Sequence, residues 1–154
     1  TETVWVYEQL HEIAIRLAAS ISYYFLNTGV PTRMICNGSD CITDQVAVIP
    51  TGSGLRHVNA IAEVLARIDL TRTVVSCTDQ LHELTNKMAN STSAPLYIMI
   101  SNSMSSSLQD AFEQLIKTGS SAMWIAPLYE DMELRVRKVP NLEIIRWEVN
   151  KYEN

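Results

Sequence analysis

The sequence has few cysteines, few basic residues and no long apolar run, and each shortage argues against a class of protein. Its 154 residues include three cysteines, an odd number that fits a reducing compartment better than a disulfide scaffold. Acidic residues outnumber basic ones by 17 to 12, and the basic residues cluster only in the short RVRK at 135–138. Neither a nucleic acid nor an anionic membrane surface is therefore an expected partner. The longest apolar stretch, residues 13–26, contains Arg16 and is too short and too polar to cross a bilayer.

The chain does contain a regular alternation of apolar segments. Apolar residues recurring every three or four positions predict helices over residues 8–26, 55–68 and 78–89, and a further helix that carries Leu108 to Ile116. Short apolar runs predict strands at residues 30–36, 44–49, 96–101, 122–127 and 142–149, and residues 71–77 fit a short strand or an extended connection. This order predicts an α/β fold, a three-layer sandwich with a mostly parallel, Rossmann-like sheet in a single domain, residues 1–154. The strand at 96–101 is expected among the central ones, because it is apolar on both faces.

Asn37-Gly38 stands between the first two predicted strands and predicts the turn of a hairpin. Cys36 and Cys41 flank this turn and could face each other across it. The sequence leaves a disulfide open, but two thiols are the favoured interpretation, because the cysteine content fits a reducing compartment.

Three segments together resemble a known family. They are AIRLAASISYYFL (residues 14–26), GVPTRMICNG (29–38) and IPTGSGLRHVNAIAEVLARI (49–68), followed later by an apolar strand that ends in Ile-Ser. The chain resembles the C-terminal part of the bacterial domain-of-unknown-function family fifty-eight, whose genes often neighbour those of MoxR-type AAA ATPases. The resemblance implies a von Willebrand factor A-like sheet, a membrane-anchored parent protein, and a location on the cytoplasmic side of the bacterial membrane.

The resemblance also implies a central first strand before the helix at Glu8. Only Thr3 to Tyr7, TVWVY, stands there, so we expect a fragment of a longer protein in which this strand is missing or reduced to that remnant. A missing strand leaves a sheet edge open, and open edges recruit strands from other chains. We therefore expect a homo-oligomer, with Trp5 and its neighbours at or near the contact.

A metal site is not expected in these residues. The von Willebrand A-like fold often holds Mg²⁺ through an Asp-x-Ser-x-Ser motif and a later Asp-Gly, all oxygen ligands. The chain has no Asp-x-Ser-x-Ser, and Asn102-Ser103 stands where the later Asp-Gly would be. Neither a metal nor another cofactor is predicted, unless a metal motif lies upstream of Thr1.

The glycine turn at residues 51–54 is the first candidate ligand site. Gly52, Ser53 and Gly54 precede a helix, so their amides could bind an anion, with Arg56 and His57 beside them. The turn lacks the lysine of a phosphate loop and the third glycine of a dinucleotide fingerprint. A tight turn and a hydrogen-bonded structural histidine explain the same residues, and we favour that interpretation.

The serine turn, residues 101–107, is the second candidate. Ser101, Asn102, Ser103 and Ser105 lie between a predicted strand and a helix, the position that a hydrolase nucleophile or an anion site would use. The hydrolase motif Gly-x-Ser-x-Gly is absent. A capping box formed by Ser106 and Gln109 gives at least one serine a structural purpose.

The sequence therefore favours a non-enzymatic protein-interaction module. Its partner is a protein, with a MoxR-type AAA ATPase or a second copy as candidates, and not a nucleic acid. Trp124 is expected in the core, whereas Trp147 alternates with Ile145 and Val149 and faces a partner or solvent. Two alternatives stay open: a metal-dependent adhesion-type domain with its motif upstream, and a small hydrolase or anion-binding enzyme.

Overall fold

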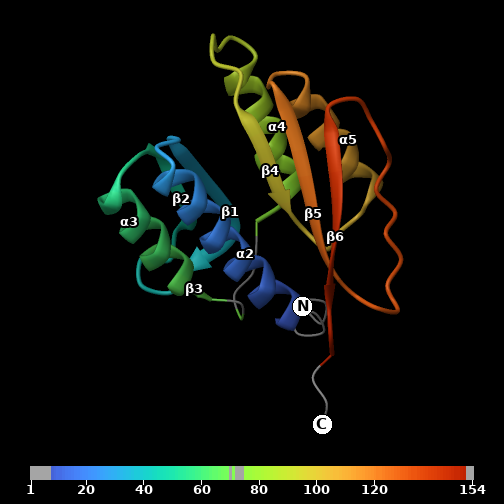
Figure 1. Cartoon of the computed structure of the whole chain (residues 1–154), viewed down its shortest axis with the longest axis horizontal. Helices are drawn as coiled ribbons and strands as arrows, with labels where there is room; N and C mark the ends of the chain where they lie inside the picture. The colour runs from blue at the N-terminus through green and yellow to red at the C-terminus, as the bar shows by residue number, and fades with distance from the viewer. Residues whose placement is uncertain (1–7, 70, 72–74, 152–154) are drawn as a thin grey trace. The chain divides into compact units, whose positions relative to one another are not determined.

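The structure is a computed structural model that describes residues 8–69, 71 and 75–151. It is a mixed α/β fold with four described helices and two three-stranded sheets, one antiparallel and one parallel (Figure 1). The fold divides into two compact units, the first ending at Ser76 and the second beginning at Cys77. The expected remnant strand, TVWVY, and residues 72–74 of the segment at 71–77 lie outside the described residues. None of the described helices combines the length and the apolar character that crossing a membrane requires.

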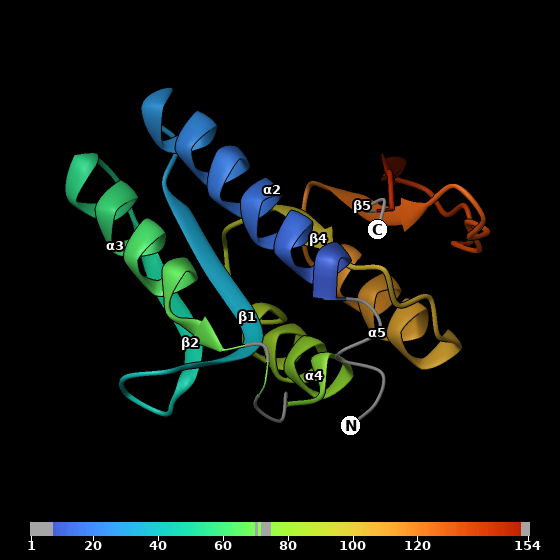
Figure 2. The ribbon, with the colours of Figure 1, turned by 90° about the horizontal axis from the view of Figure 1, so that it is seen from below.

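The first unit places two helices against an antiparallel sheet. Helices α2 (Glu8–Asn27) and α3 (Leu55–Ala66) pack side by side on strands β1 (Thr32–Asp40) and β2 (Val46–Gly52), and the short β3 (Ile68–Asp69) pairs with the end of β1 (Figure 2). The core takes residues from all four longer elements: Leu26, Met34, Ile49, Ile61 and Leu65. The two predicted helices are confirmed. The prediction of one mostly parallel sheet is wrong here, because a short hairpin joins β1 to β2 and forces them antiparallel.

The hairpin does not turn at Asn37-Gly38, and that prediction is also wrong. Strand β1 continues through both residues to Asp40, and the chain turns at residues 41–45. Between successive pairs β1 advances four residues, from Ile35 to Ser39, while β2 advances only two. The extra residues form a bulge, so Asn-Gly provides local bending inside the strand rather than the reversal of the chain.

The three cysteines are thiols in the structure, as the sequence favoured. Cys36 lies half-buried in the bulge, and its Sγ atom accepts a hydrogen bond from the backbone N–H of Gly38 at 3.3 Å. Burial raises the pKa of the Cys36 thiol above its ordinary value, so this thiol is protonated at neutral pH. Cys41 is exposed in the turn, and Cys77 begins the first helix of the second unit.

The second unit contains the parallel sheet. It runs from α4 (Cys77–Met88) through β4 (Leu96–Ile100), α5 (Ser106–Ile116) and β5 (Ser121–Tyr129) to β6 (Leu142–Val149). The strand order is β4-β5-β6, and all three strands point the same way. Each predicted element of this unit is present, and β6 has the predicted bounds.

Among the described strands β5 is the middle one and β4 lies at an edge, so within this part of the chain the prediction that the strand at 96–101 is central is wrong. Residues 124–129 of β5 are all buried, whereas Leu96 at the start of β4 is 44% exposed. Both strands are apolar on both faces, so the sequence pattern alone could not rank them. The pairing partners decide which strand is enclosed on two sides.

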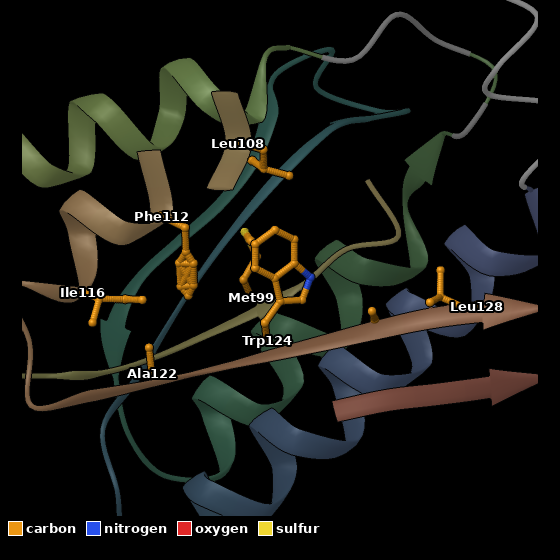
Figure 3. Close-up of a cluster of buried hydrophobic side chains, with 8 residues drawn as sticks. Met99, Leu108, Phe112, Ile116, Ala122, Trp124 and Leu128 are labelled. Atoms are coloured by element: carbon orange, nitrogen blue, oxygen red, sulfur yellow. The ribbon is translucent and has the colours of Figure 1, made fainter. Parts of the chain in front are cut away.

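The core of the second unit lies on one face of the parallel sheet, which we call the Trp124 face. Figure 3 shows Trp124 beside Phe112 of α5, with ring centroids 5.7 Å apart. Helix α4 reaches the same cluster through Cys77 and Leu81, so both helices of the unit contribute to this face. Trp124 is 1% exposed, which confirms its predicted place in the core.

An extended segment, residues 130–141, connects β5 to β6, and we call it the strap. Parallel strands are usually joined through a helix, but the strap contains none. Its apolar side chains pack on the core cluster: Met132, Leu134, Val136 and Val139. Arg146 of β6 holds the start of the strap: it donates hydrogen bonds to the carbonyl of Met132 at 2.7 Å and to that of Tyr129, the last residue of β5, at 2.8 Å.

Candidate functional site

His57 folds back over the glycine turn and makes a structural hydrogen bond. Its Nε2 atom lies 2.7 Å from the carbonyl oxygen of Thr32, and Nε2 carries the proton because a carbonyl oxygen only accepts. The ring fills the space beside Gly52, where a Cβ atom would overlap its Nδ1 atom. Gly52 is therefore needed for close approach of the ring, which ties α3 to the first residue of β1.

Gly54 is required by its backbone conformation. It precedes α3 with φ of 82° and ψ of −179°, a combination that side chains other than glycine avoid. Its carbonyl accepts hydrogen bonds from the backbone of His57 and Val58 at 3.1 and 3.2 Å. Ser53 and Arg56 are exposed beside it. Local geometry thus accounts for both glycines of the turn without a ligand.

Ser101 organises the start of the serine turn at the carboxyl end of β4. Its backbone N–H donates to Ile125 at 3.1 Å, and its carbonyl accepts from the indole Nε1 of Trp124 at 3.1 Å. Its Oγ atom accepts from the backbone of Ser103, also at 3.1 Å. Asn102 is half-buried and Ser103 is exposed. Ser101 therefore closes the turn and satisfies the polar atom of the buried tryptophan.

The N-cap of α5 is Ser105, so the predicted capping box of Ser106 and Gln109 is wrong. The Oγ atom of Ser105 accepts a hydrogen bond from the backbone N–H of Leu108 at 3.3 Å. The box failed because the helix begins one residue earlier than a Ser106 cap requires, which leaves Gln109 on the buried side of α5.

Gln109 holds the strap to α5. Its Nε2 atom donates to the carbonyls of Met104 and Arg135 at 2.9 and 3.0 Å, and its Oε1 atom accepts from the backbone N–H of Arg137 at 2.9 Å. The side chain is only 6% exposed, so these bonds are shielded from water. Sequence analysis missed this role, because a partner 26 to 28 positions away leaves no local signal.

The two candidate groups belong to different units: the glycine turn to the first and the serine turn to the second. In the described part of the second unit the histidine is His82, exposed on α4, and no hydrogen bond joins a histidine or carboxylate to a serine of the serine turn. No three His, Cys, Asp or Glu side chains gather as a metal group in residues 8–69, 71 and 75–151. The described contacts of these groups thus serve turns, caps and strand ends.

Asp40 joins the β1–β2 turn to Arg67, the residue that follows α3. Its Oδ1 atom accepts from the backbone N–H of Ile42 at 2.8 Å and of Thr43 at 3.3 Å, which closes the β1–β2 turn. Its Oδ2 atom lies 2.9 Å from Nε of Arg67, an ion pair whose angle is too poor for a hydrogen bond. The backbone bond from Ile42 and the Arg67 charge hold the pKa of Asp40 below its ordinary value.

The other side of the parallel sheet, which we call the Trp147 face, is a second surface. In the sequence, only Trp147 pointed to it. Strand alternation and register place on it a set of apolar residues: Leu96, Ile98, Ile100, Met123, Ile125, Pro127, Tyr129, Ile145, Trp147 and Val149. Four of them are buried: Ile125, Pro127, Tyr129 and Val149. None of them belongs to the core cluster that the two helices form. Leu96 and Trp147 are 44% and 46% exposed, which confirms that Trp147 is not a core residue.

A shallow hollow of about 340 Å³ lies at the amino ends of the three strands. Leu96 and Met123 line it with apolar atoms, and Ser121, Asn141 and Glu143 add polar ones. Ala122 and Leu142 also line the hollow, and their side chains belong to the Trp124 face. The hollow therefore lies at the strand ends and adjoins the Trp147 face.

Comparison of the chain with models of protein families, with curated proteins and with solved structures finds no match.

Proposed function

We propose that the chain is a non-enzymatic protein-interaction module that binds its partner through the Trp147 face. One observation carries this proposal. Both helices of the second unit pack on the Trp124 face, while Leu96 and Trp147 on the other face are about half exposed. Leu96 and Trp147 stand at opposite ends of this face, with the half-buried Met123 and Ile145 between them. Tryptophan is enriched at protein contact sites.

The hollow at the amino ends of the strands favours a peptide-like partner. An apolar floor with polar groups around it is the usual composition of a protein interface. Leu96 and Met123 suit an aliphatic side chain of the partner, and Glu143 suits a basic group next to it.

The resemblance to family fifty-eight supports the remaining parts of the proposal. It favours a von Willebrand A-like, three-layer arrangement of the whole domain, and stable parallel sheets are usually covered on both faces. It also favours a membrane-anchored bacterial parent protein, with this part on the cytoplasmic side. The partner to test first is a MoxR-type AAA ATPase, because the genes of the resembled family often neighbour those of such ATPases.

The test is a binding titration between the fluorescently labelled chain and that purified ATPase. We expect saturable binding that Leu96→Lys weakens roughly tenfold, because the substitution replaces an apolar lining residue of the hollow with an ammonium group. The matched control is Tyr23→Lys on α2, since Tyr23 is an exposed apolar residue of the first unit and is 56% exposed. It should leave the affinity within about twofold.

Two results would contradict the proposal. One is the absence of binding at about 100 µM, a concentration at which any complex of roughly micromolar Kd is saturated. The other is a Leu96→Lys variant that binds as tightly as the original chain.

A further inference from the structure

The outer edge of β6 pairs with no other strand among the described residues. Strand β6 pairs with β5 on one side and is last in the strand order. It has eight residues, contains neither proline nor glycine, and keeps register with β5 over its full length. Edges are normally guarded by proline, by bulges or by shortness, and the β1–β2 pair shows two of these in Pro50 and its register shifts.

The direction of the backbone groups on β6 follows from its pairing. The N–H of Ala122 in β5 donates to the carbonyl of Asn141 at 2.8 Å. In β6 the backbone groups of the odd-numbered residues therefore point toward β5 and bond to it. The N–H and C=O groups of Ile144, Arg146 and Glu148 therefore point outward, in the plane of the sheet. They form a row that a further strand can bond.

We propose that this edge binds the β6 edge of a second copy of the chain, antiparallel and centred on Trp147. A twofold axis there sets Arg146 opposite Glu148 of the partner subunit, and the reverse pair follows by symmetry. The outward groups of these residues are those that make the hydrogen bonds of such a ladder. Trp147 then lies opposite the partner's Trp147, on the other face of the sheet. This pair makes no backbone hydrogen bonds, and the side chains of such pairs come closest.

Charge complementarity selects this register. Centring the pair on Arg146 or on Glu148 would set like charges opposite each other. With Trp147 at the centre, each Arg146 lies opposite the partner's Glu148. Within one copy, Nε of Arg146 already lies 3.9 Å from Oε2 of Glu148, so positive and negative charges alternate among the four side chains. The terminal nitrogens of Arg146 donate to the carbonyls of Met132 and Tyr129. Its Nε side therefore faces the two Glu148 carboxylates.

The flanking pairs in the same register also match. Ile145 lies opposite the partner's Val149, an apolar pair, and Glu143 opposite the partner's Lys151, an ion pair. Lys151 already donates to Asp131 at 3.0 Å, so the outer pair adds charge complementarity to an existing contact. With Trp147 46% exposed and Glu148 55% exposed, the central residues are accessible to a second copy.

Sedimentation of the full chain over a dilution series tests the association. We expect a dimer of the 17.3 kDa chain, and Glu148→Arg should raise the dimer Kd at least tenfold by setting two arginines opposite each other in both halves. The matched control is Glu83→Arg, the same charge change on the exposed surface of α4, which should leave Kd unchanged. Arg146 is left intact, because it also holds the strap.

Cysteine cross-linking tests the register. Cα atoms of a non-bonded antiparallel pair lie about 4.5 Å apart, within disulfide range. Mild oxidation should therefore join Trp147→Cys to its copy, whereas the Cys of Ile145→Cys would lie about 13 Å from its own copy and should stay unlinked. The unmodified chain controls for Cys36, Cys41 and Cys77.

A monomeric chain, a dimer that survives Glu148→Arg, or equal cross-linking at both positions would each overturn the proposal. The dimer covers Trp147 but not the hollow. The two proposals are tested separately, because Leu96→Lys leaves the β6 edge intact and Glu148→Arg leaves the hollow intact.

Discussion

Replacing Gln109 by methionine should loosen the strap. Methionine has a similar length and is apolar, so the substitution removes the hydrogen bonds without leaving a large cavity. Three bonds disappear: two donated to the carbonyls of Met104 and Arg135, and one accepted from the backbone N–H of Arg137. The carbonyl of Met104 and the strap groups then lose their partners.

The expected loss in the free energy of unfolding is about 2–4 kcal/mol. Each bond contributes about 0.5–1.5 kcal/mol net, and a group left buried without a partner costs more. The strap residues Arg135 and Arg137 are themselves exposed, so water can replace part of the lost hydrogen bonding. The loss in the free energy of unfolding therefore stays below what three fully buried bonds would give. Against a usual total of about 5–15 kcal/mol, the change is large enough to measure.

Urea denaturation followed by tryptophan fluorescence measures this change, because Trp124 lies in the cluster on which the strap packs. Gln114→Met is the matched control: the same substitution on the same helix at an exposed position, expected to change stability by less than about 0.5 kcal/mol. Faster hydrogen exchange at the Arg137 amide in the Gln109 variant would locate the effect in the strap. If both variants unfold at the same urea concentration, Gln109 does not hold the strap and the reasoning fails.

Four further outcomes are expected. Gly52→Ala should push the His57 ring off the Thr32 carbonyl and lower the free energy of unfolding by about 1–3 kcal/mol, and a melting temperature equal to that of the original chain would refute this. Folding lowers the pKa of Asp40, so the ionised carboxylate stabilises the fold fully at a pH above the pKa of the unfolded chain. This stabilisation disappears as the pH falls below about 4, and Asp40→Asn should flatten that part of the plot of stability against pH. Ile98→Asp, at a half-buried position on the Trp147 face, should lower the urea midpoint, and an unchanged midpoint would show that the charge stays in water. Calorimetric titration with Mg²⁺ should give no stoichiometric sub-millimolar binding, and such binding would disprove the metal prediction.

The local elements of this fold could be predicted because each depends on neighbours in the sequence. Helix α4 lies within one residue of the predicted 78–89, and β6 coincides with the predicted 142–149. Alternation along β6 also placed Trp147 outside the core, since successive strand residues point to opposite faces. At the glycine turn, the expected structural histidine follows from the position of His57 in the first turn of α3, next to Gly52.

The order of strands, the place of the hairpin turn and the role of Gln109 were decided only by the tertiary structure. Apolar patterns show that β4 and β5 are buried to some extent, but not that β5 has a partner on each side. Asn37-Gly38 is a strong turn signal, but the pairing of β1 with β2 places these two residues in a bulge within β1. Gln109 bonds to a strap 26 to 28 residues away. Such contacts depend on which distant segments meet in the folded chain, and local propensity carries no information about that meeting.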